Sequence, residues 1–236
     1  MCPMPELSDH PITGRWPPMN PAVIQLYSFP TFNGAKISIA LEEMGLPYEV
    51  HRVTLSPADL ESPEFLSLNP NGKVPAIIDP DGPDGLPLGL FESGAILLYL
   101  AAKSGQLGGK TAADKARVTQ WLMFQMGALG PMIGQLGYFT KFAGAEIEDR
   151  RPRDHFTAEV KRLLAVLDGA LEGQDWIAGD YSIADIAIAP WLRGLERYGV
   201  KALLGWDQYT NLVAYLDRFL ARPAVQIGLV TPPREG

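Results

Sequence analysis

The sequence predicts an α/β domain followed by an all-helical domain. In residues 22–105, short segments rich in branched apolar residues alternate with segments of helical periodicity. From residue 106 onward, apolar residues recur almost only at helical spacing, and the glycine-rich joint "SGQLGGK" precedes this change. The chain has 236 residues, of which 47% are hydrophobic, which is enough to bury two cores.

The composition of the chain limits the kinds of binding partner and the cellular location that we expect. A net charge of -7 without a run of Lys or Arg argues against a nucleic-acid or anionic membrane surface. The apolar stretches are too short to span a bilayer. Cys2 is the single cysteine, so one chain can form neither an internal disulfide nor a zinc site based on cysteine. We therefore expect a cytoplasmic protein without a bound metal, a membrane or a nucleic acid as partner.

Residues 1–21 precede the first predicted strand and are rich in proline. Five prolines occur before Pro21, and proline favours extended backbone. We expect an extended arm that either packs on a neighbour or stays in solvent.

The first half of the α/β domain predicts a parallel strand pair. Residues 22–27 form a strand that ends in the turn "FPTFNG", and residues 48–55 form a second strand. Between them, a helix begins near Gly34 with Asn33 as a candidate cap, and Gly45 ends it. Its apolar face carries Ile37, Ala40, Leu41 and Met44, whereas Lys36, Glu42 and Glu43 are expected to face away.

The second half predicts a hairpin and a helix. Residues 73–79 and 88–91 are strands joined by the turn-rich "PDGPDGLP". Residues 93–105 are helical and apolar on nearly every side, so we expect this helix to be buried on both faces. The resulting order, β-α-β and then β-β-α, matches a thioredoxin-like domain with a mixed four-stranded sheet.

Pro75 stands inside the third predicted strand. Because proline cannot donate to the ladder, it must lie on an edge or among the first residues of the strand. We expect a cis Val74–Pro75 bond that leaves the Val74 main chain able to bind an extended peptide. The alternative is an ordinary trans proline that starts an edge strand.

Glu92 and Ser93 precede the apolar helix. Ser93 is predicted as its N-cap, where a hydroxyl and unpaired amides attract an anion, and Glu92 attracts a cation. An amino-acid ligand carries both charges. The alternative is a plain cap beside a solvated glutamate.

These features together resemble the glutathione transferase superfamily. The segments "YSFPTFNGAKISIALEEMGLPYE", "PEFLSLNPNGKVPAI", "FESGAILLYLA" and "WLMFQMGALGPMIGQ" are similar to the nu class, that is, to bacterial glutathione-dependent disulfide-bond oxidoreductases. The resemblance covers about residues 22–225. It implies a thioredoxin-like domain (22–105), a helical-bundle domain (106–225) and a tail (226–236).

The resemblance implies a glutathione site at these positions. The Val74 main chain, next to Pro75, would pair with the cysteinyl unit, Glu92 and Ser93 would hold the γ-glutamyl end, and Lys73 would face the glycine carboxylate or stay a solvated turn residue. Thr31 and Asn33 would be the catalytic residues that stabilise the thiolate. Tyr27 is expected to pack at the strand end, and Ser28 is a further candidate hydroxyl.

Two neutral donors suit this chemistry. A thiol with a pKa near 8.5 is only a few per cent ionised at neutral pH. Lowering that pKa to about 6.5 takes roughly 2.7 kcal/mol, which two charge-assisted hydrogen bonds from the Thr31 hydroxyl and the Asn33 amide could supply. With no cysteine near position 31, disulfide exchange must use the sulfurs of glutathione itself.

The implied function is that of a homodimeric, glutathione-dependent disulfide reductase with weaker transferase or peroxidase activity. Its second substrate would be a disulfide, a peroxide or an electrophile. The alternative is a non-catalytic glutathione-binding or regulatory protein on the same fold. Leu60, His155 and Phe156 depart from nu-class residues tied to glutathione, and Arg150, Arg151 or Arg153 are candidate substitutes.

The helical domain carries two further patterns. Ser182 and Asp185 form a capping box whose role is structural. Residues 156–171 place leucines on one core-facing stripe. A third group either packs in the core or shapes a pocket for an apolar co-substrate: Trp121, Met123, Phe124, Met126 and Met132.

Overall fold

A computed structural model describes residues 7–234 of the chain. The chain divides into two compact units. The first ends at Gly105 but also includes the C-terminal segment that begins at Pro223, and the second is Gln106–Arg222. The helical domain expected over 106–225 is therefore three residues shorter. The segment expected as a separate tail, as far as it is described, belongs with the first unit.

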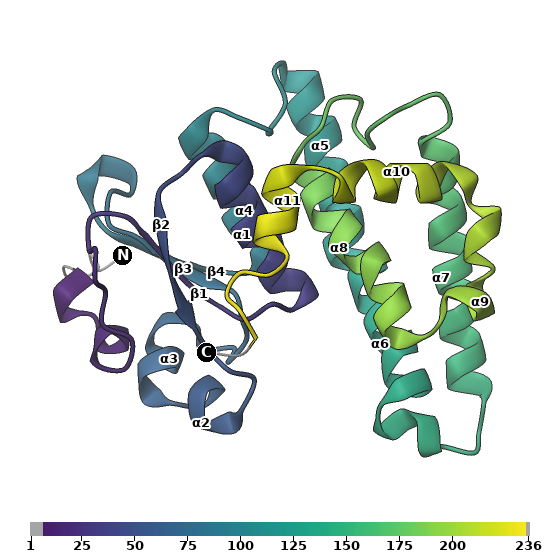
Figure 1. Cartoon of the computed structure of the whole chain (residues 1–236), viewed down its shortest axis with the longest axis horizontal. Coiled ribbons are helices and arrows are strands. Elements are labelled where there is room, and N and C mark those ends of the chain that lie inside the picture. Colours follow the sequence, from purple (N-terminus) through teal and green to yellow (C-terminus); the bar gives the residue numbers. More distant parts are fainter. Residues whose placement is uncertain (1–6, 235–236) are drawn as a thin grey trace. The chain divides into compact units, whose positions relative to one another are not determined.

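The first unit contains a mixed four-stranded sheet in the order β2-β1-β3-β4 (Figure 1). Its strands are β1 (Ile24–Ser28), β2 (Tyr48–Arg52), β3 (Ala76–Asp79) and β4 (Leu88–Phe91). β1 runs parallel to β2 and antiparallel to β3, and β3 and β4 form an antiparallel pair. The predicted mixed sheet and its hairpin are confirmed.

The described part of the first unit contains the α-helices α1 (Phe32–Met44), α2 (Pro57–Leu60), α3 (Pro63–Leu68), α4 (Ser93–Ser104) and α11 (Pro223–Gly228). α1 packs against both α4 and α11, although α11 lies near the opposite end of the chain (Figure 1). Because of this double cover, nine of the thirteen residues of α1 are buried. Lys36 is one of them, so the prediction that it faces solvent is wrong.

The helix α4 is less covered than its sequence predicts. Ile96, Leu97 and Leu100 are fully buried, but the Leu98 side chain is 37% exposed and Ala95 is exposed as well. The expectation that both faces are buried is therefore wrong for the single chain. Apolar composition indicates that a helix has a buried side, but it does not show how many neighbours pack against it.

Residues 7–21 are folded onto the first unit. Two short 3₁₀ turns, Leu7–Asp9 and Pro11–Gly14, place Leu7 and Ile12 in a buried cluster with Phe65 and other residues of the domain. The Trp16 ring meets the Phe65 ring edge-on with centroids 6.1 Å apart. Over these residues, the alternative in which the arm stays in solvent is wrong, because its apolar side chains are buried in the core. The arm packs on the domain, but part of it forms 3₁₀ turns where extended backbone was expected. Cys2 lies outside the described residues.

The second unit is helical: α5 (Ala112–Phe124), α6 (Gly130–Lys141), α7 (Arg151–Ala170), α8 (Ile183–Tyr198), α9 (Lys201–Leu204) and α10 (Thr210–Leu220). A π-helical segment, Gln125–Leu129, joins α5 to α6. The apolar stripe of α7 and eleven of the sixteen residues of α8 contribute to the core of the unit.

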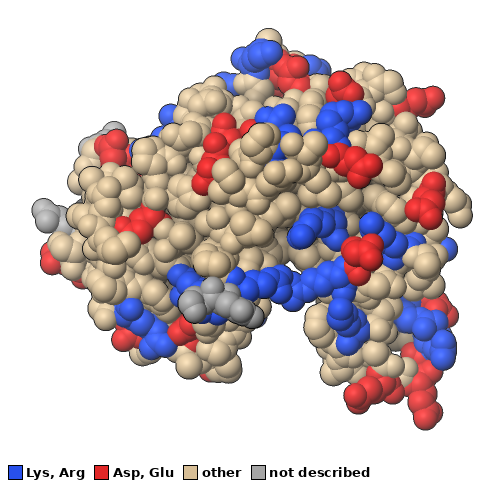
Figure 2. Space-filling model, in the orientation of Figure 1, with Lys and Arg blue, Asp and Glu red and all other residues tan. Residues whose placement is uncertain are grey.

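The capping box predicted at the start of α8 is present. The Ser182 side chain caps the helix, and the Asp185 carboxylate accepts from the Ser182 amide at 2.9 Å. Within residues 7–234, no helix combines the length and apolar character needed to cross a bilayer. Figure 2 shows charged side chains of both signs scattered over one face, with wide uncharged areas between them.

Candidate active site

The strand register brings three of the predicted site segments to one end of the sheet. Tyr27 near the end of β1 lies opposite Ala76 at the start of β3, and Ala76 lies opposite Phe91 at the end of β4. The segments just beyond these pairs are the loop to Thr31, the Val74–Pro75 bond and the Glu92–Ser93 step. Residues that are more than sixty positions apart in the sequence therefore meet at this end of the sheet.

The Val74–Pro75 peptide bond is cis, as predicted. Pro75 is buried directly before the first residue of β3, and Val74 is half-buried. β3 is an inner strand, so of the two positions predicted for the proline, the start of a strand is the observed one. No hydrogen bond to the Val74 main chain occurs among the described residues, while the preceding Lys73 carbonyl accepts from the Asn69 side chain.

Glu92 has a backbone conformation that is uncommon for a residue with a side chain. Its φ is 72° and its ψ is 110°, and it stands at the N-cap position of α4 with its side chain exposed. Ser93 is the first residue of the helix and is 3% exposed, so the prediction of Ser93 as N-cap is displaced by one residue. Strained backbone of this kind concentrates at ligand sites.

Thr31 caps the helix α1. Its side-chain oxygen accepts from the Gly34 amide at 3.0 Å, and its own φ and ψ are extended. The candidate cap at Asn33 is therefore wrong: the helix begins at Phe32, and Asn33 is its half-buried second residue. Since the Thr31 oxygen accepts from the helix, its hydroxyl hydrogen is directed elsewhere and can be donated.

Tyr27 and Ser28 are fully buried and do not present their hydroxyls to a ligand. The Tyr27 ring stacks on His51 with centroids 4.7 Å apart, which confirms that it packs at the strand end. Burial and the Glu49 charge raise the Tyr27 pKa well above its ordinary value. A Cβ atom on Gly34 would lie only 2.6 Å from the Ser28 Oγ, so the Ser28 hydroxyl faces the start of α1.

Lys36 lies next to the candidate residue Ser93, and the sequence pattern did not identify it. Its side chain is fully buried, and its Nζ lies 3.4 Å from the Ser93 Oγ. Burial lowers the Lys36 pKa to about 7, although the Glu92 charge acts in the opposite direction. No sequence pattern could have identified Lys36, because it lies off the apolar stripe of α1. The residue that it contacts, Ser93 of α4, is 57 positions away in the sequence.

The C-terminal segment reaches the loop that precedes Thr31. The Arg234 guanidinium donates to the Pro30 carbonyl at 3.3 Å, and Arg52 donates to the Arg234 carbonyl. The Arg52 guanidinium also lies 5.8 Å from the centre of the Phe29 ring. The described end of the chain therefore contacts Pro30, the residue directly before the catalytic threonine candidate, while Arg52 of β2 contacts Phe29.

The remaining candidates are placed within their own units. Leu60 packs against the buried cluster around Phe65. The arginines at the start of α7 lie in the second unit, where Arg151 pairs with Asp149, and the Arg151 side chain is 90% exposed. The apolar group in α5, α6 and the π-helical segment between them is not core: Met123 is 48% exposed, and the other four members are half-buried.

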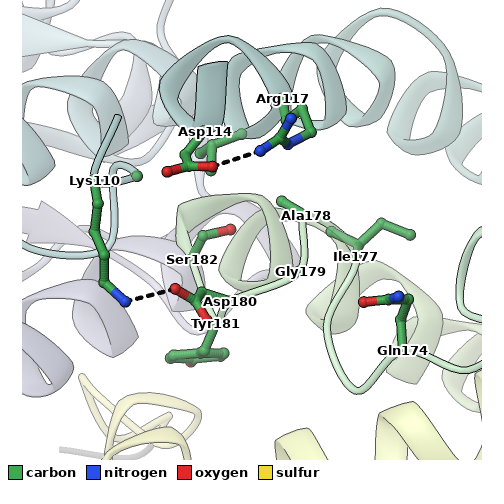
Figure 3. A pocket seen from close by; sticks show the side chains of 12 residues that line it. Lys110, Asp114, Arg117, Gln174, Ile177, Ala178, Gly179, Asp180, Tyr181 and Ser182 are labelled. Atoms are coloured by element: carbon green, nitrogen blue, oxygen red, sulfur yellow. Dashed lines mark hydrogen bonds and ion pairs between the residues drawn. The ribbon is translucent and has the colours of Figure 1, made fainter. Parts of the chain in front are cut away.

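A hollow of about 450 Å³ in the second unit is separate from these residues (Figure 3). Its charged side chains pair with one another, Lys110 with Asp180 at 2.8 Å and Arg117 with Asp114 at 2.5 Å. Of the predicted site residues, only the structural Ser182 lines it. Across residues 7–234, no group of three or more His, Cys, Asp or Glu side chains is arranged to hold a metal ion.

Comparison with known proteins identifies the family. The model of the glutathione S-transferase N-terminal domain matches residues 22–102, and that of the C-terminal domain matches residues 131–223. The chain is 42% identical over 204 residues to the disulfide-bond oxidoreductase YfcG of Escherichia coli. This match covers 86% of this chain and 92% of that protein.

Two solved structures are closer in sequence. A glutathione transferase from Pseudomonas putida, with one glutathione disulfide bound per subunit, is 57% identical with a TM-score of 0.95. The match covers 97% of this chain and all of that one. A glutathione transferase from Burkholderia graminis, with two glutathione molecules bound per subunit, is 58% identical with a TM-score of 0.94, covering 97% and 96%. The chain belongs to the glutathione transferase family.

Proposed function

We propose that this protein is a glutathione transferase that reduces disulfides with glutathione as co-substrate, and that it also has weaker transferase or peroxidase activity. Relatives with the names disulfide-bond oxidoreductase and glutathione transferase, matched over nearly their whole length, support this function. The observation that carries it is the Thr31 cap, because its hydroxyl hydrogen can be donated at the head of α1.

The proposed reaction needs no cysteine of the protein. The thiolate of bound glutathione attacks one sulfur of the substrate disulfide, and a new glutathione–substrate disulfide forms as the other sulfur leaves as a thiolate. A second glutathione thiolate then attacks the glutathione sulfur of this mixed disulfide. It releases the substrate thiolate and forms glutathione disulfide, so the two electrons come from two glutathiones.

Thr31 and Asn33 are the proposed catalytic residues. The Thr31 hydroxyl and the Asn33 amide would donate to the sulfur, and the N-terminus of α1 favours negative charge at the same place. In other classes of the superfamily, a tyrosine or serine hydroxyl activates the thiol. Tyr27 and Ser28 are not proposed for this role here, because both side chains are fully buried. The protein therefore favours the thiolate by solvating it and has no base to remove its proton.

The rest of glutathione is proposed to extend along the sheet end. The Val74 main chain next to Pro75 would pair with the cysteinyl unit, and the exposed Lys73 would face the glycine carboxylate. The γ-glutamyl carboxylate would lie at Ser93 and the head of α4, and its ammonium would lie at the exposed Glu92 carboxylate. The strained Glu92 backbone supports a ligand contact there.

We further propose a cytoplasmic homodimer. The exposed apolar side chains of Phe91 and Leu98, each 37% exposed in the single chain, support a second copy as cover for this part of the first unit. The co-substrate is proposed to be a small disulfide, peroxide or electrophile.

The test of the proposed function is a titration of the bound thiol. Ultraviolet absorbance of the thiolate, followed against pH, should give a pKa near 6.5 in place of about 8.5. Thr31→Val should return the pKa toward 8.5 and lower turnover of hydroxyethyl disulfide at pH 6.5 by about tenfold or more. Thr31→Ser keeps both the hydroxyl and the cap, so it should stay close to the wild type.

Activity assays separate the proposed reactions. Turnover of hydroxyethyl disulfide should exceed turnover of an aryl halide under the same glutathione concentration. Absence of glutathione-dependent turnover with both substrates and with a peroxide would overturn the proposal. An unchanged thiol pKa in Thr31→Val would overturn the role of that residue.

A further inference from the structure

Two arginines that are far apart in the sequence meet at the loop before Thr31. The Arg234 guanidinium donates to the Pro30 carbonyl at 3.3 Å, and the Arg52 guanidinium donates to the Arg234 carbonyl. The Arg52 guanidinium also lies 5.8 Å from the centre of the Phe29 ring. Both arginine side chains are exposed to solvent. Two positive charges therefore lie beside this loop at the surface of the first unit.

The protein does not neutralise these two charges within residues 7–234. Over that range, neither guanidinium forms an ion pair, whereas Arg15, the other arginine of the first unit, pairs with Asp59 at 2.5 Å. The Asp59 carboxylate also accepts from the Thr54 amide at 2.8 Å and from the Thr54 hydroxyl at 2.6 Å, so it is already occupied. Each guanidinium has five N–H donors and matches the geometry of a carboxylate. The pair therefore suits an anionic ligand.

These charges lie within reach of the reaction proposed at Thr31. The Pro30 carbonyl belongs to the peptide group that joins Pro30 to Thr31, so standard bond lengths place the Arg234 guanidinium within about 10 Å of the Thr31 hydroxyl. A carboxylate one carbon away from a disulfide sulfur lies about 4 Å from that sulfur. A short disulfide attacked by the glutathione thiolate can therefore bring its carboxylate to within about 8 Å of the guanidiniums, where salt does not fully screen the attraction.

We propose that Arg52 and Arg234 are specificity-determining residues for the co-substrate. They favour disulfides that carry a carboxylate close to the sulfur–sulfur bond over neutral and cationic disulfides. The inference rests on the proposed function, because it names the class of disulfide that is reduced at that site. In water, the thiolate and the carboxylates of glutathione repel an anionic disulfide. Positive charge beside the loop offsets this repulsion, and it gives no advantage to a neutral disulfide.

The experiment compares three disulfides of similar size and different charge. Dithiodiacetate carries two negative charges, hydroxyethyl disulfide carries none, and cystamine carries two positive charges. The kcat/KM of each is measured at pH 7 with saturating glutathione, through the glutathione disulfide that forms. Each value is divided by the rate constant of the uncatalysed reaction with glutathione, because the thiolate alone already discriminates by charge. This enhancement should be at least about fivefold larger for dithiodiacetate than for hydroxyethyl disulfide, and smallest for cystamine.

Arg52→Gln and Arg234→Gln test the two residues, with Arg193→Gln as the matched control. Each variant should lower the preference for dithiodiacetate over hydroxyethyl disulfide by about two- to fivefold, and the double variant should abolish it. Turnover of hydroxyethyl disulfide should stay within about twofold of the wild type. Arg193 is an exposed arginine on α8 in the second unit, so its replacement should leave the preference unchanged.

The salt dependence gives a second measure of the same charges. Raising the ionic strength from about 20 mM to about 500 mM shortens the screening length severalfold. The preference of the wild type for dithiodiacetate should then fall toward that of the double variant, while the double variant should change little. A preference of the wild type that does not respond to salt would contradict a role of the two guanidiniums.

The outcomes separate this inference from the proposed function. Equal enhancement for the three disulfides, or a preference that the double variant keeps, would overturn the role of Arg52 and Arg234 while the reductase activity stands. An equal loss of turnover with neutral and anionic disulfides in the variants would also overturn it, because the arginines would then support the loop and not select by charge. If the wild type reduces none of the three disulfides, the proposed function fails, and this inference fails with it.

Discussion

Asp185 and Lys36 are both fully buried charged side chains, yet their surroundings differ. The Asp185 carboxylate accepts from the Ile177 amide at 3.0 Å and from the Ser182 amide at 2.9 Å, so both of its oxygens are occupied by the protein. The Lys36 Nζ lies 3.4 Å from the Oγ of Ser93, the first residue of α4, where a ligand is proposed. The first arrangement stabilises the fold, whereas the second suits a binding site.

Replacement of Asp185 by alanine should lower the free energy of unfolding by at least about 2 kcal/mol, because two buried main-chain amides lose their acceptor. Enzyme that remains folded should keep its turnover, since the residue lies in the helical unit and serves as a cap. Thermal unfolding and steady-state kinetics on the same preparation measure the two effects.

Asp114→Ala is the matched control for this prediction. Asp114 forms the same capping box with Thr111 at the start of α5, but at the surface. It should destabilise the protein less than Asp185→Ala does. A variant Asp185→Ala with unchanged melting temperature and lost activity would show that the residue has a catalytic role instead.

The helix α1 shows how an element is positioned by a residue that has no side chain. A Cβ on Gly34 would lie 2.0 Å from the Phe29 carbonyl oxygen and 2.6 Å from the Ser28 Oγ. The first turn of α1 therefore packs directly on the end of β1. This close approach places the Thr31 cap and Asn33 at the end of the sheet where Val74 and Glu92 also lie.

Gly34→Ala should displace the start of α1, because neither backbone nor the buried serine can yield by the required distance. We expect a stability loss of at least about 2 kcal/mol and a loss of glutathione affinity of tenfold or more. Chemical denaturation and titration calorimetry measure these effects.

The control is Gly169→Ala in α7. A Cβ at this exposed helical position meets no atom within 4 Å. This change should raise stability by about 0.5–1 kcal/mol, because alanine is the better helix former. If both alanine variants were equally stable, the close packing at Gly34 would be refuted as the reason for a glycine there.

At the scale of the whole molecule, the first unit is discontinuous in sequence. After the helical unit, the chain returns as α11, and the Ser38 hydroxyl on α1 donates to the Gly228 carbonyl at 2.7 Å. A Cβ on Gly228 would lie 2.6 Å from Ile39, so the two helices are in close contact. The C-terminal segment is thus part of the domain that carries the proposed site.

A chain that ends after Arg222 should lose at least about 3 kcal/mol of stability, because it uncovers α1 and removes the buried Val225. Because α11 packs against α1, whose N-terminus carries Thr31 and Asn33, the variant should also bind glutathione weakly. Thermal unfolding and calorimetry test both expectations. A chain that ends after Thr231 keeps α11 and should retain most of the stability; equal behaviour of the two truncations would contradict this account.

Much of the proposed site could be read from local sequence. The strand and turn residues around Pro75 predicted its place before a strand, and Thr31, Glu92 and Ser93 follow or precede recognisable strands and helices. The similarity of several segments to disulfide-bond oxidoreductases predicted the type of relative, and the 42% identity to YfcG agrees with this prediction. The exact caps differed by one or two residues, since several polar residues near a helix start compete for the same amides.

What the sequence by itself determined is the set of strands and helices and their order, because hydrophobic periodicity and turn chemistry act over a few neighbouring residues. What only the tertiary structure decided is which surfaces are covered: the docking of residues 7–21, the partly exposed α4, and the burial of Lys36, which contacts Ser93 of α4. These depend on contacts such as that between Ser38 and Gly228, 190 residues apart, which no local pattern records.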